Sequence, residues 1–513
     1  MKRPIRWLIL LMAAILCLSS ISALAEEKVE ITWLGYYTSN LTVGENTYAE
    51  KLIEDRFGVE IIPVTDVSKE NMDVFISSGD ISKVTCYASY LKSDFTYMYE
   101  QGLIREFPEE WLWEYYPTGM KIYSDYLGED FFENGNHLVH GKCLYIPFTT
   151  TTNTSERVAL YRKDWMEKLG LSEPTTLEEL HDMLHAFTFD DPDGNGIDDT
   201  YGANFSLAWY GPWILYGAFG ITQNSAKEGS FILQEDGSVI YTSATEEYKE
   251  ALAIFKQWYD EGIIDPESVT DDRSACRTKW ANGTTGFMCD SQTWYYSNRG
   301  SSSIAAMATE VFGEGTVDAL GAITSEYGDG TVYSWRNFPN VRSNRALSFT
   351  AGASDDQIIA VLQILEGMAS DHDFMLKILF GEEGVDYDWD GEQLKVRPEV
   401  SIEYMASKGI SDTFYGYAAT DPYIAKVTFS DQDKAFIAKS ETFPMLTAPT
   451  NFTDVTNESK KVYFDEVLKL EGEFLSNVLL GVVDLEADWD QHVADMYAAG
   501  LDKILTEYEE KLN

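Results

Sequence analysis

Residues 29–64 read VEITWLGYYTSNLTVGENTYAEKLIEDRFGVEIIPV, and this stretch decides the fold class. Apolar and polar side chains alternate over 28–33, which predicts a half-buried strand. A helix is expected over 48–57, and Gly58 follows it as a C-terminal stop. A second strand is expected over 59–64. This strand–helix–strand order recurs along the chain and predicts an α/β fold.

Further helices are expected in the middle and at the end of the chain. One ends at Gly170, and the next begins with Thr175 as its cap and Glu178 as the reciprocal partner. Apolar residues at helical spacing predict another helix over 246–261 and a C-terminal helix from Leu501. We find no internal repeat and no low-complexity linker, so we expect compact units that are joined by chain crossings rather than by a flexible tether.

The N-terminus has the features of an export signal. A basic start is followed by an apolar run over 7–18 and by small residues at 23–25. This order predicts a secretory signal peptide that is cleaved after Ala25, and the run is too short to cross a hydrocarbon core of about 30 Å. A buried N-terminal helix is the alternative. A lipid anchor on Cys17 is disfavoured because the residue before it, Leu16, is large.

The charge of the chain excludes some classes of partner. After removal of the predicted signal, 35 basic and 85 acidic residues remain, a net charge of −50. Such a surface repels nucleic acid and anionic lipid. It argues less strongly against an anionic ligand, because a local basic pocket can override the global field. The 44% apolar and 14% aromatic residues indicate a large core rather than a disordered chain.

Cysteine and histidine patterns do not predict a zinc site. Four cysteines remain after the predicted signal, with no CxxC pair and no HExxH motif. Cys276 and Cys289 are close enough in sequence to pair, but their spacing does not decide whether they do.

Residues 191–199, DPDGNGIDD, form the most specific local motif. Oxygen-bearing side chains at alternate positions converge when the backbone curls, as in calcium-binding loops. The predicted ligands are Asp191, Asp193, Asn195, the Ile197 carbonyl and Asp199. The usual glutamate at loop position 12 is replaced by Gly202, so the last ligand must be Thr200, water or a distant residue. We expect a structural Ca²⁺ here; an exposed turn without metal is the alternative.

Aromatic residues gather in three segments that carry turn residues. They are Trp209, Tyr210 and Trp213, then Trp294, Tyr295 and Tyr296, and finally Trp335. Aromatic faces stack on sugar rings while nearby polar groups bind the hydroxyls. These residues are therefore candidate sugar contacts; the alternative is that each ring fills the core.

Several longer pieces, taken in order, resemble a known family. They are GKCLYIP at 141–147, PTTLEEL at 174–180, the DPDGNG loop, YKEALAIFKQWYDEGIIDPE at 248–267, WANGTTGFM at 280–288 and DWDQHVADMYAAGLDKIL at 488–505. Together they resemble the extracellular solute-binding proteins (family 1) of carbohydrate ABC transporters, in the group of LplA-like and alginate-binding proteins.

The resemblance implies an α/β, two-lobed periplasmic-binding-protein-like fold (type II) with a ligand cleft between the lobes. The expected N-terminal lobe contains 26–150 and about 340–385; the C-terminal lobe contains 151–339 and about 386–513. The resemblance also implies calcium at the 191–199 loop. The expected ligand contacts, including the aromatic candidates above, are Tyr36, Tyr37, Asp80, Tyr87, Trp209, Tyr210, Trp294, Tyr295 and Trp335.

The implied function is capture of an oligosaccharide or related solute for the transmembrane subunits of an ABC permease. We expect an exported, monomeric protein that is not an enzyme and binds no nucleic acid. Two alternatives stay open. A secreted glycan-active enzyme is one, because paired carboxylates are the usual catalysts of that class and acids are abundant. A partner that presents its ligand to a membrane sensor is the other.

Overall fold

A computed structural model describes most of the chain after the predicted signal peptide, which lies outside the described residues. The described residues are 28–35, 43–65, 67, 71–89, 93–127, 132–133, 137–139, 141–148, 157–208, 211–221, 223–291, 295, 303–328, 332–334, 345–411, 414–419, 422–440, 442–443, 445–447, 452 and 455–512.

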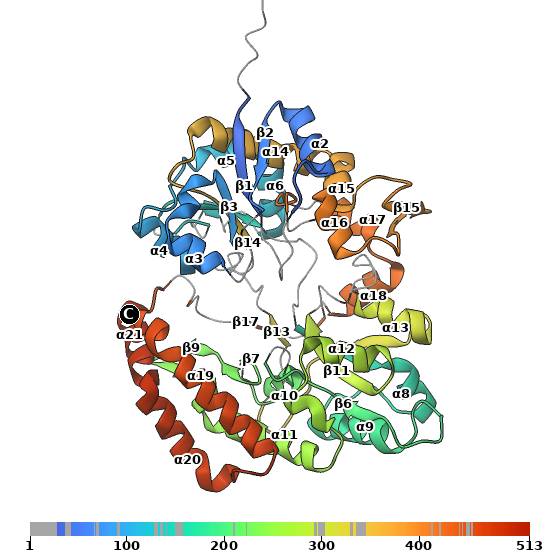
Figure 1. Cartoon of the computed structure of the whole chain (residues 1–513). Coiled ribbons are helices and arrows are strands. Elements are labelled where there is room, and N and C mark those ends of the chain that lie inside the picture. The colour runs from blue at the N-terminus through green and yellow to red at the C-terminus, as the bar shows by residue number, and fades with distance from the viewer. Residues whose placement is uncertain are drawn as a thin grey trace, which may run out of the picture.

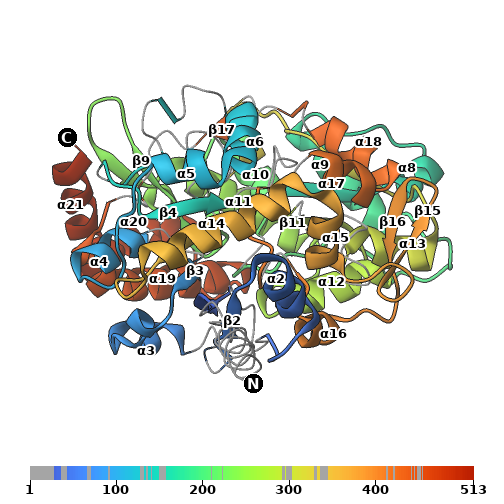
Figure 2. The same cartoon turned by 90° about the horizontal axis from the view of Figure 1, so that it is seen from above.

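The chain forms two lobes, one above the other in Figure 1. The first lobe contains a five-stranded sheet in the order β2 (Glu60–Pro63), β1 (Glu30–Leu34), β3 (Cys86–Ser89), β14 (Arg345–Phe349) and β4 (Tyr145–Phe148). Strand β1 is parallel to β2 and β3, whereas β14 is antiparallel to both β3 and β4. Helix α14 (Asp355–Ser370) runs across this lobe in Figure 2 and contacts β1 and the helices α2 (Tyr48–Phe57), α5 (Glu110–Tyr115) and α6 (Pro117–Leu127).

Local signals account for helix α2. The Thr47 hydroxyl accepts a hydrogen bond from the Glu50 amide, and the Glu50 carboxylate accepts one from the Thr47 amide, which together form a capping box. Gly58 ends the helix in the left-handed conformation, with φ of 67°. The predicted helix over 48–57 and the strands on either side of it are confirmed.

The second lobe is built on a four-stranded sheet in the order β12 (Val317–Leu320), β5 (Arg157–Arg162), β11 (Thr285–Ser291) and β6 (Tyr201–Ala203). Its helices include α8 (Lys163–Leu169), α9 (Leu177–Phe189), α11 (Glu246–Asp260) and α12 (Arg273–Ala281). Three helices end the chain, namely α19 (Glu458–Leu479), α20 (Leu485–Met496) and α21 (Asp502–Leu512), and they lie together on one side of this lobe (Figure 1).

The predicted cap of helix α9 is wrong by one residue. Thr176 is the cap and Glu179 its reciprocal partner. The cause is a tertiary contact, because Thr324 donates to the Thr175 carbonyl and accepts from the Leu177 amide at 2.9 Å each. This pairing keeps the chain extended through Thr176, so the helix begins one residue later than expected.

Each lobe has its own hydrophobic core. The first core takes in buried residues between Ile31 and Ile146 and between Ala346 and Val427. It therefore includes residues 387–427, which we expected in the second lobe, because side chains such as Tyr387 and Ile410 pack there. Phe429 and later buried residues pack in the second lobe. We propose that the lobe boundary lies near residue 428 rather than 386.

The chain thus crosses between the lobes three times. The first crossing joins β4 to β5, the second joins β13 (Val332–Ser334) to β14, and the third lies between residues 427 and 429.

The structure answers whether Cys276 and Cys289 pair and whether a described helix could span a membrane. Cys276 and Cys289 are buried thiols that form no disulfide in the part of the chain that the structure describes. None of the described helices combines the length and apolar character that a membrane span requires.

A buried carboxyl group lies between α19 and the strands of the second lobe. Glu471 is 1% exposed, and it accepts hydrogen bonds from the Tyr241 hydroxyl at 2.6 Å and from the Ser243 hydroxyl. Burial raises the pKa of Glu471 to about 7; the two hydroxyls oppose that rise, and the Glu228 charge adds to it.

Candidate functional site

The strand ends of both sheets face the place where the chain crosses between the lobes. In the first lobe, Phe148 ends β4 just before a crossing, and it pairs with Arg345, which begins β14 just after another. Strand β3 is antiparallel to β14, so its last residue, Ser89, lies at the same edge. Because β1 is parallel to β3, its carboxyl end lies there too.

The second sheet shows the same arrangement. Arg157 begins β5 after the first crossing and pairs with Ser291, the last residue of β11. Strand β6 is parallel to β11, so its carboxyl end points the same way. Ligands of open α/β sheets bind outside the carboxyl ends of strands. These two edges, which we call the crossing edges, are therefore the candidate ligand site.

Three of the nine predicted ligand contacts follow strand ends of the crossing edges in sequence, and a fourth follows β13, just before the second crossing. Tyr36 and Tyr37 come after Leu34, Trp294 after Ser291, and Trp335 directly after Ser334. Six predicted contacts lie outside the described residues, namely Tyr36, Tyr37, Trp209, Tyr210, Trp294 and Trp335. Their roles stay predictions.

The other three predicted contacts lie in described parts of the chain. Asp80 presents its carboxylate to solvent, 2.5 Å from the Lys83 ammonium, and the hydrogen bond from Lys83 lowers the pKa of Asp80. Tyr87 is 2% exposed on β3. Tyr295 is 1% exposed, stacks on Phe436 with ring centroids 3.7 Å apart, and accepts a hydrogen bond from Gln432. Both rings fill cores in this structure, so a contact with ligand is an untested prediction for them.

The 191–199 loop joins α9 to β6 and is tightly curled. Asp191 has φ of 47°, and Gly194 and Gly196 have φ of 76° and 74°, a region in which glycine is favoured. The Gly196 amide donates to Asp191 Oδ2 at 3.2 Å. The Asn195 side-chain amide donates to Asp193 Oδ2 at 2.8 Å and to Asp199 Oδ1 at 3.1 Å.

The loop fits a hard cation. Asp191 Oδ1 is buried and has no hydrogen-bond partner among the described residues, so it is available as a ligand for a metal ion. Burial opposes ionisation of Asp191, but hydrogen bonds from Gly196 and its neighbours lower the pKa of its carboxyl group. The Asn195 side-chain oxygen accepts from the Ile197 amide at 2.6 Å in this structure, so a ligand role for that oxygen requires the amide to rotate toward the Asp193 and Asp199 carboxylates. The Ile197 side chain is 61% exposed and points outward, which suits a residue that contributes only its carbonyl.

Thr200 does not suit the last ligand position. Its hydroxyl is buried and donates to the Phe187 carbonyl at 2.9 Å. The last ligand of a cation in this loop would therefore be water or a distant residue.

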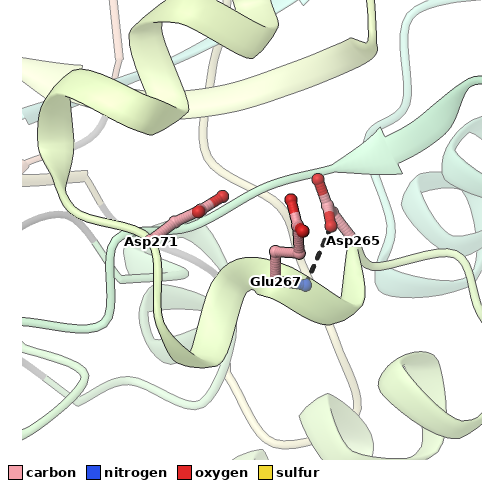
Figure 3. A group of neighbouring side chains, drawn as sticks. All are labelled: Asp265, Glu267 and Asp271. Atoms are coloured by element: carbon pink, nitrogen blue, oxygen red, sulfur yellow. Dashed lines mark hydrogen bonds between the residues drawn. The ribbon is translucent and has the colours of Figure 1, made fainter.

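A second acidic cluster was missed by the sequence analysis. Asp265, Glu267 and Asp271 lie in and beside a short 3₁₀ helix, η3 (Pro266–Val269), and their carboxylates point toward a common space (Figure 3). The Lys279 ammonium lies 2.7 Å, 2.6 Å and 2.7 Å from the three. Burial opposes protonation, but the three carboxylates raise the pKa of Lys279. This lysine takes the place of a cation, so we interpret the cluster as a structural one.

Comparison with known proteins agrees with the fold. No protein-family model matches the chain. The polygalacturonan/rhamnogalacturonan-binding protein YtcQ of Bacillus subtilis (strain 168) is 21% identical over 502 residues, which cover 94% of this chain and 91% of YtcQ. The fructooligosaccharide ABC transporter substrate-binding protein FusA of Streptococcus pneumoniae serotype 4 is 35% identical over 118 residues, 22% of this chain and 21% of FusA. The chain is a homologue of carbohydrate solute-binding proteins.

Solved structures show the same fold. The alginate-binding protein AlgQ2, in a structure without calcium ion, matches with a TM-score of 0.67 at 17% identity, over 95% of this chain and 99% of AlgQ2. FusA in complex with kestose matches with a TM-score of 0.65 at 18% identity, over 94% and 98% of the two chains. An EF-hand mutant of FusA has also been solved. The predicted α/β, two-lobed solute-binding-protein fold is confirmed.

Proposed function

We propose that this chain captures an oligosaccharide between its lobes and delivers it to the transmembrane subunits of an ABC importer. The observation that carries the proposal is that, in each sheet, carboxyl ends of strands lie at the edge from which the chain crosses to the other lobe. Homology to YtcQ and FusA, whose names specify oligosaccharide or polysaccharide ligands, supports a carbohydrate. Closure of the lobes on the ligand would present a changed surface to the permease.

We further propose that the 191–199 loop binds a structural Ca²⁺ through Asp191, Asp193, Asn195, the Ile197 carbonyl and Asp199. The buried, unpartnered Asp191 oxygen supports this assignment. Calcium in an extracellular medium would keep even a weak site occupied. Export after cleavage of the predicted signal peptide is part of the same proposal, as is a function in binding rather than catalysis.

The test is a ligand screen on the purified chain without residues 1–25. Of the 13 tryptophans in the full sequence, all except Trp7 remain in this shortened chain and give a strong fluorescence signal; thermal unfolding gives a second readout. We expect at least one oligosaccharide to give saturable changes in both and to be recovered intact. Cleaved products would support a glycan-active enzyme instead. A broad panel of glycans without any response would overturn the proposal.

A further inference from the structure

Two histidines lie one turn apart on helix α9, beside the end of helix α11. His181 and His185 are at positions i and i+4, and their ring centroids are 6.1 Å apart. The Nε2 atom of His181 lies 2.6 Å from Oε2 of Glu261, the residue that ends α11. Sequence spacing could not indicate this cluster, because 80 residues separate His181 from Glu261.

The carboxylate of this cluster is held in a fixed orientation. Gln257, one turn earlier on α11, donates a hydrogen bond to Glu261 Oε1 at 2.7 Å, which leaves Oε2 for His181. The hydrogen bonds from Gln257 and His181 lower the pKa of Glu261 against the opposing effect of burial, so Glu261 is ionised at neutral pH. Carboxylates that bind metal ions are oriented by hydrogen bonds of this kind.

Both histidines can be reached from solvent. His181 keeps 27% of its side chain exposed and packs on the buried Trp258, with ring centroids 6.1 Å apart. His185 is exposed and packs against Phe189, with ring centroids 4.6 Å apart. A cation can therefore meet both imidazoles while helix α9 stays folded.

Two imidazoles and one carboxylate are a ligand set for a divalent transition-metal ion. Histidines four residues apart on one face of a helix bind zinc together, and a carboxylate oxygen supplies a third protein ligand beside water. Calcium prefers oxygen ligands alone, so this cluster selects a different ion from the 191–199 loop. The acidic chain attracts cations to its surface in general.

We propose that His181, His185 and Glu261 bind a divalent transition-metal ion of the Zn²⁺ type, which ties α9 to the end of α11. The ion takes the place of the proton between His181 Nε2 and Glu261 Oε2, and these two atoms move slightly apart to make room for it. In the structure the three residues do not bring one ligand atom each within 4.8 Å of one another, so the exposed His185 ring must turn toward the pair. The inference is independent of oligosaccharide capture.

The experiment is a calorimetric titration of Zn²⁺ into the chain without residues 1–25. Excess Ca²⁺ is present throughout, so that sites made of oxygen ligands are already filled. We expect one saturable Zn²⁺ site per chain. Zinc should also raise the midpoint of thermal unfolding, because it binds the folded chain. Absence of saturable Zn²⁺ binding would overturn the proposal.

Three variants locate the site. H185A removes one ligand and keeps the contact between His181 and Glu261, so we expect its Zn²⁺ affinity to fall by about 10-fold or more. Because His185 is exposed, its replacement should leave the midpoint of unfolding without Zn²⁺ unchanged. E261Q removes the charged ligand and should weaken Zn²⁺ binding as well. The control H372Q removes the histidine that begins α15 (His372–Phe380) in the first lobe, and it should bind Zn²⁺ like the wild type.

The variants distinguish this cluster from zinc binding elsewhere on the acidic surface. A Zn²⁺ affinity that H185A and E261Q share with the wild type would overturn the proposal. Equal losses in H185A and H372Q would overturn it too. A loss confined to H185A and E261Q would support it.

Discussion

Replacement of Glu471 by glutamine tests how a buried carboxyl group affects the second lobe. The pKa of Glu471 is raised to about 7 from an ordinary value of 4.5, mainly by burial. A shift of that size corresponds to about 3 kcal/mol, at 1.36 kcal/mol for each pKa unit. Glutamine has nearly the same shape; its amide oxygen can accept from one of the two hydroxyls while its NH2 group donates to the other, and it does not titrate.

The direction in which pH changes the free energy of unfolding follows from the protons bound in the folded and unfolded states. Between pH 4.5 and 7 the folded state keeps the proton on Glu471, whereas the unfolded state has released it. The contribution of this group to the free energy of unfolding is therefore present below pH 4.5. It falls by up to about 3 kcal/mol as the pH rises to 7. E471Q lacks this loss, so its stability relative to the wild type should rise over that window.

Hydrogen exchange measured by mass spectrometry is the suitable assay, because a chain with two lobes need not unfold in a single step. Peptides that cover 228–243 and 462–480 report the free energy of local opening at each pH, after correction for intrinsic exchange rates. The control E473Q removes an exposed carboxyl group from the same helix. It should keep the pH dependence of the wild type. If E471Q also keeps that dependence, the reasoning about the buried carboxyl group is refuted.

Three other substitutions test the remaining sites. Calcium at 100 times its dissociation constant should stabilise the wild type by about 2.7 kcal/mol in thermal unfolding. D193A should lose this stabilisation, whereas the control E267Q, in the second acidic cluster, should keep it. The same response to calcium in both variants would contradict the loop assignment. G500A should destabilise the chain by about 1–3 kcal/mol, because Gly500 has φ of 113° and an added Cβ would lie 2.5 Å from an aromatic ring. The control G481A, at a glycine with φ of 69° and open space around it, should destabilise the chain less than G500A does. Equal losses in the denaturant midpoint of both variants would refute the steric explanation. K279M should lower the free energy of unfolding by about 3–5 kcal/mol, because it leaves three carboxylates without their cation. An unchanged free energy of unfolding would show that water solvates these carboxylates.

The sequence predicted well the elements that local interactions determine. Helix α2 has its predicted bounds because its capping box and Gly58 both lie within a few residues of its ends. The cap of α9 was missed by one residue because two threonines are adjacent and a contact with Thr324 selects between them. The curled 191–199 loop was predicted because its glycines and acidic residues all lie within nine residues, whereas calcium binding there stays a prediction.

The features that depend on distant contacts could not be predicted. Lys279 lies eight or more residues from the three carboxylates that it joins, and nothing in their spacing indicates that they meet. The hairpin that begins at Tyr387 follows a helix of the first lobe, but its sequence does not show on which core its few apolar side chains will pack. For the ligand site, the sequence patterns indicated which types of residue could contact a sugar. Only the strand register showed that the strands before some of these residues end at one edge of each sheet.

The three covalent crossings have a kinetic consequence. On the proposed function, an oligosaccharide that binds one lobe would meet the other as an intramolecular partner, at an effective concentration of the order of millimolar. The second set of contacts then forms without another diffusional encounter. Even modest affinity in each lobe can therefore combine into tight retention, and a fragment with one lobe alone should release the same ligand far faster than the whole chain.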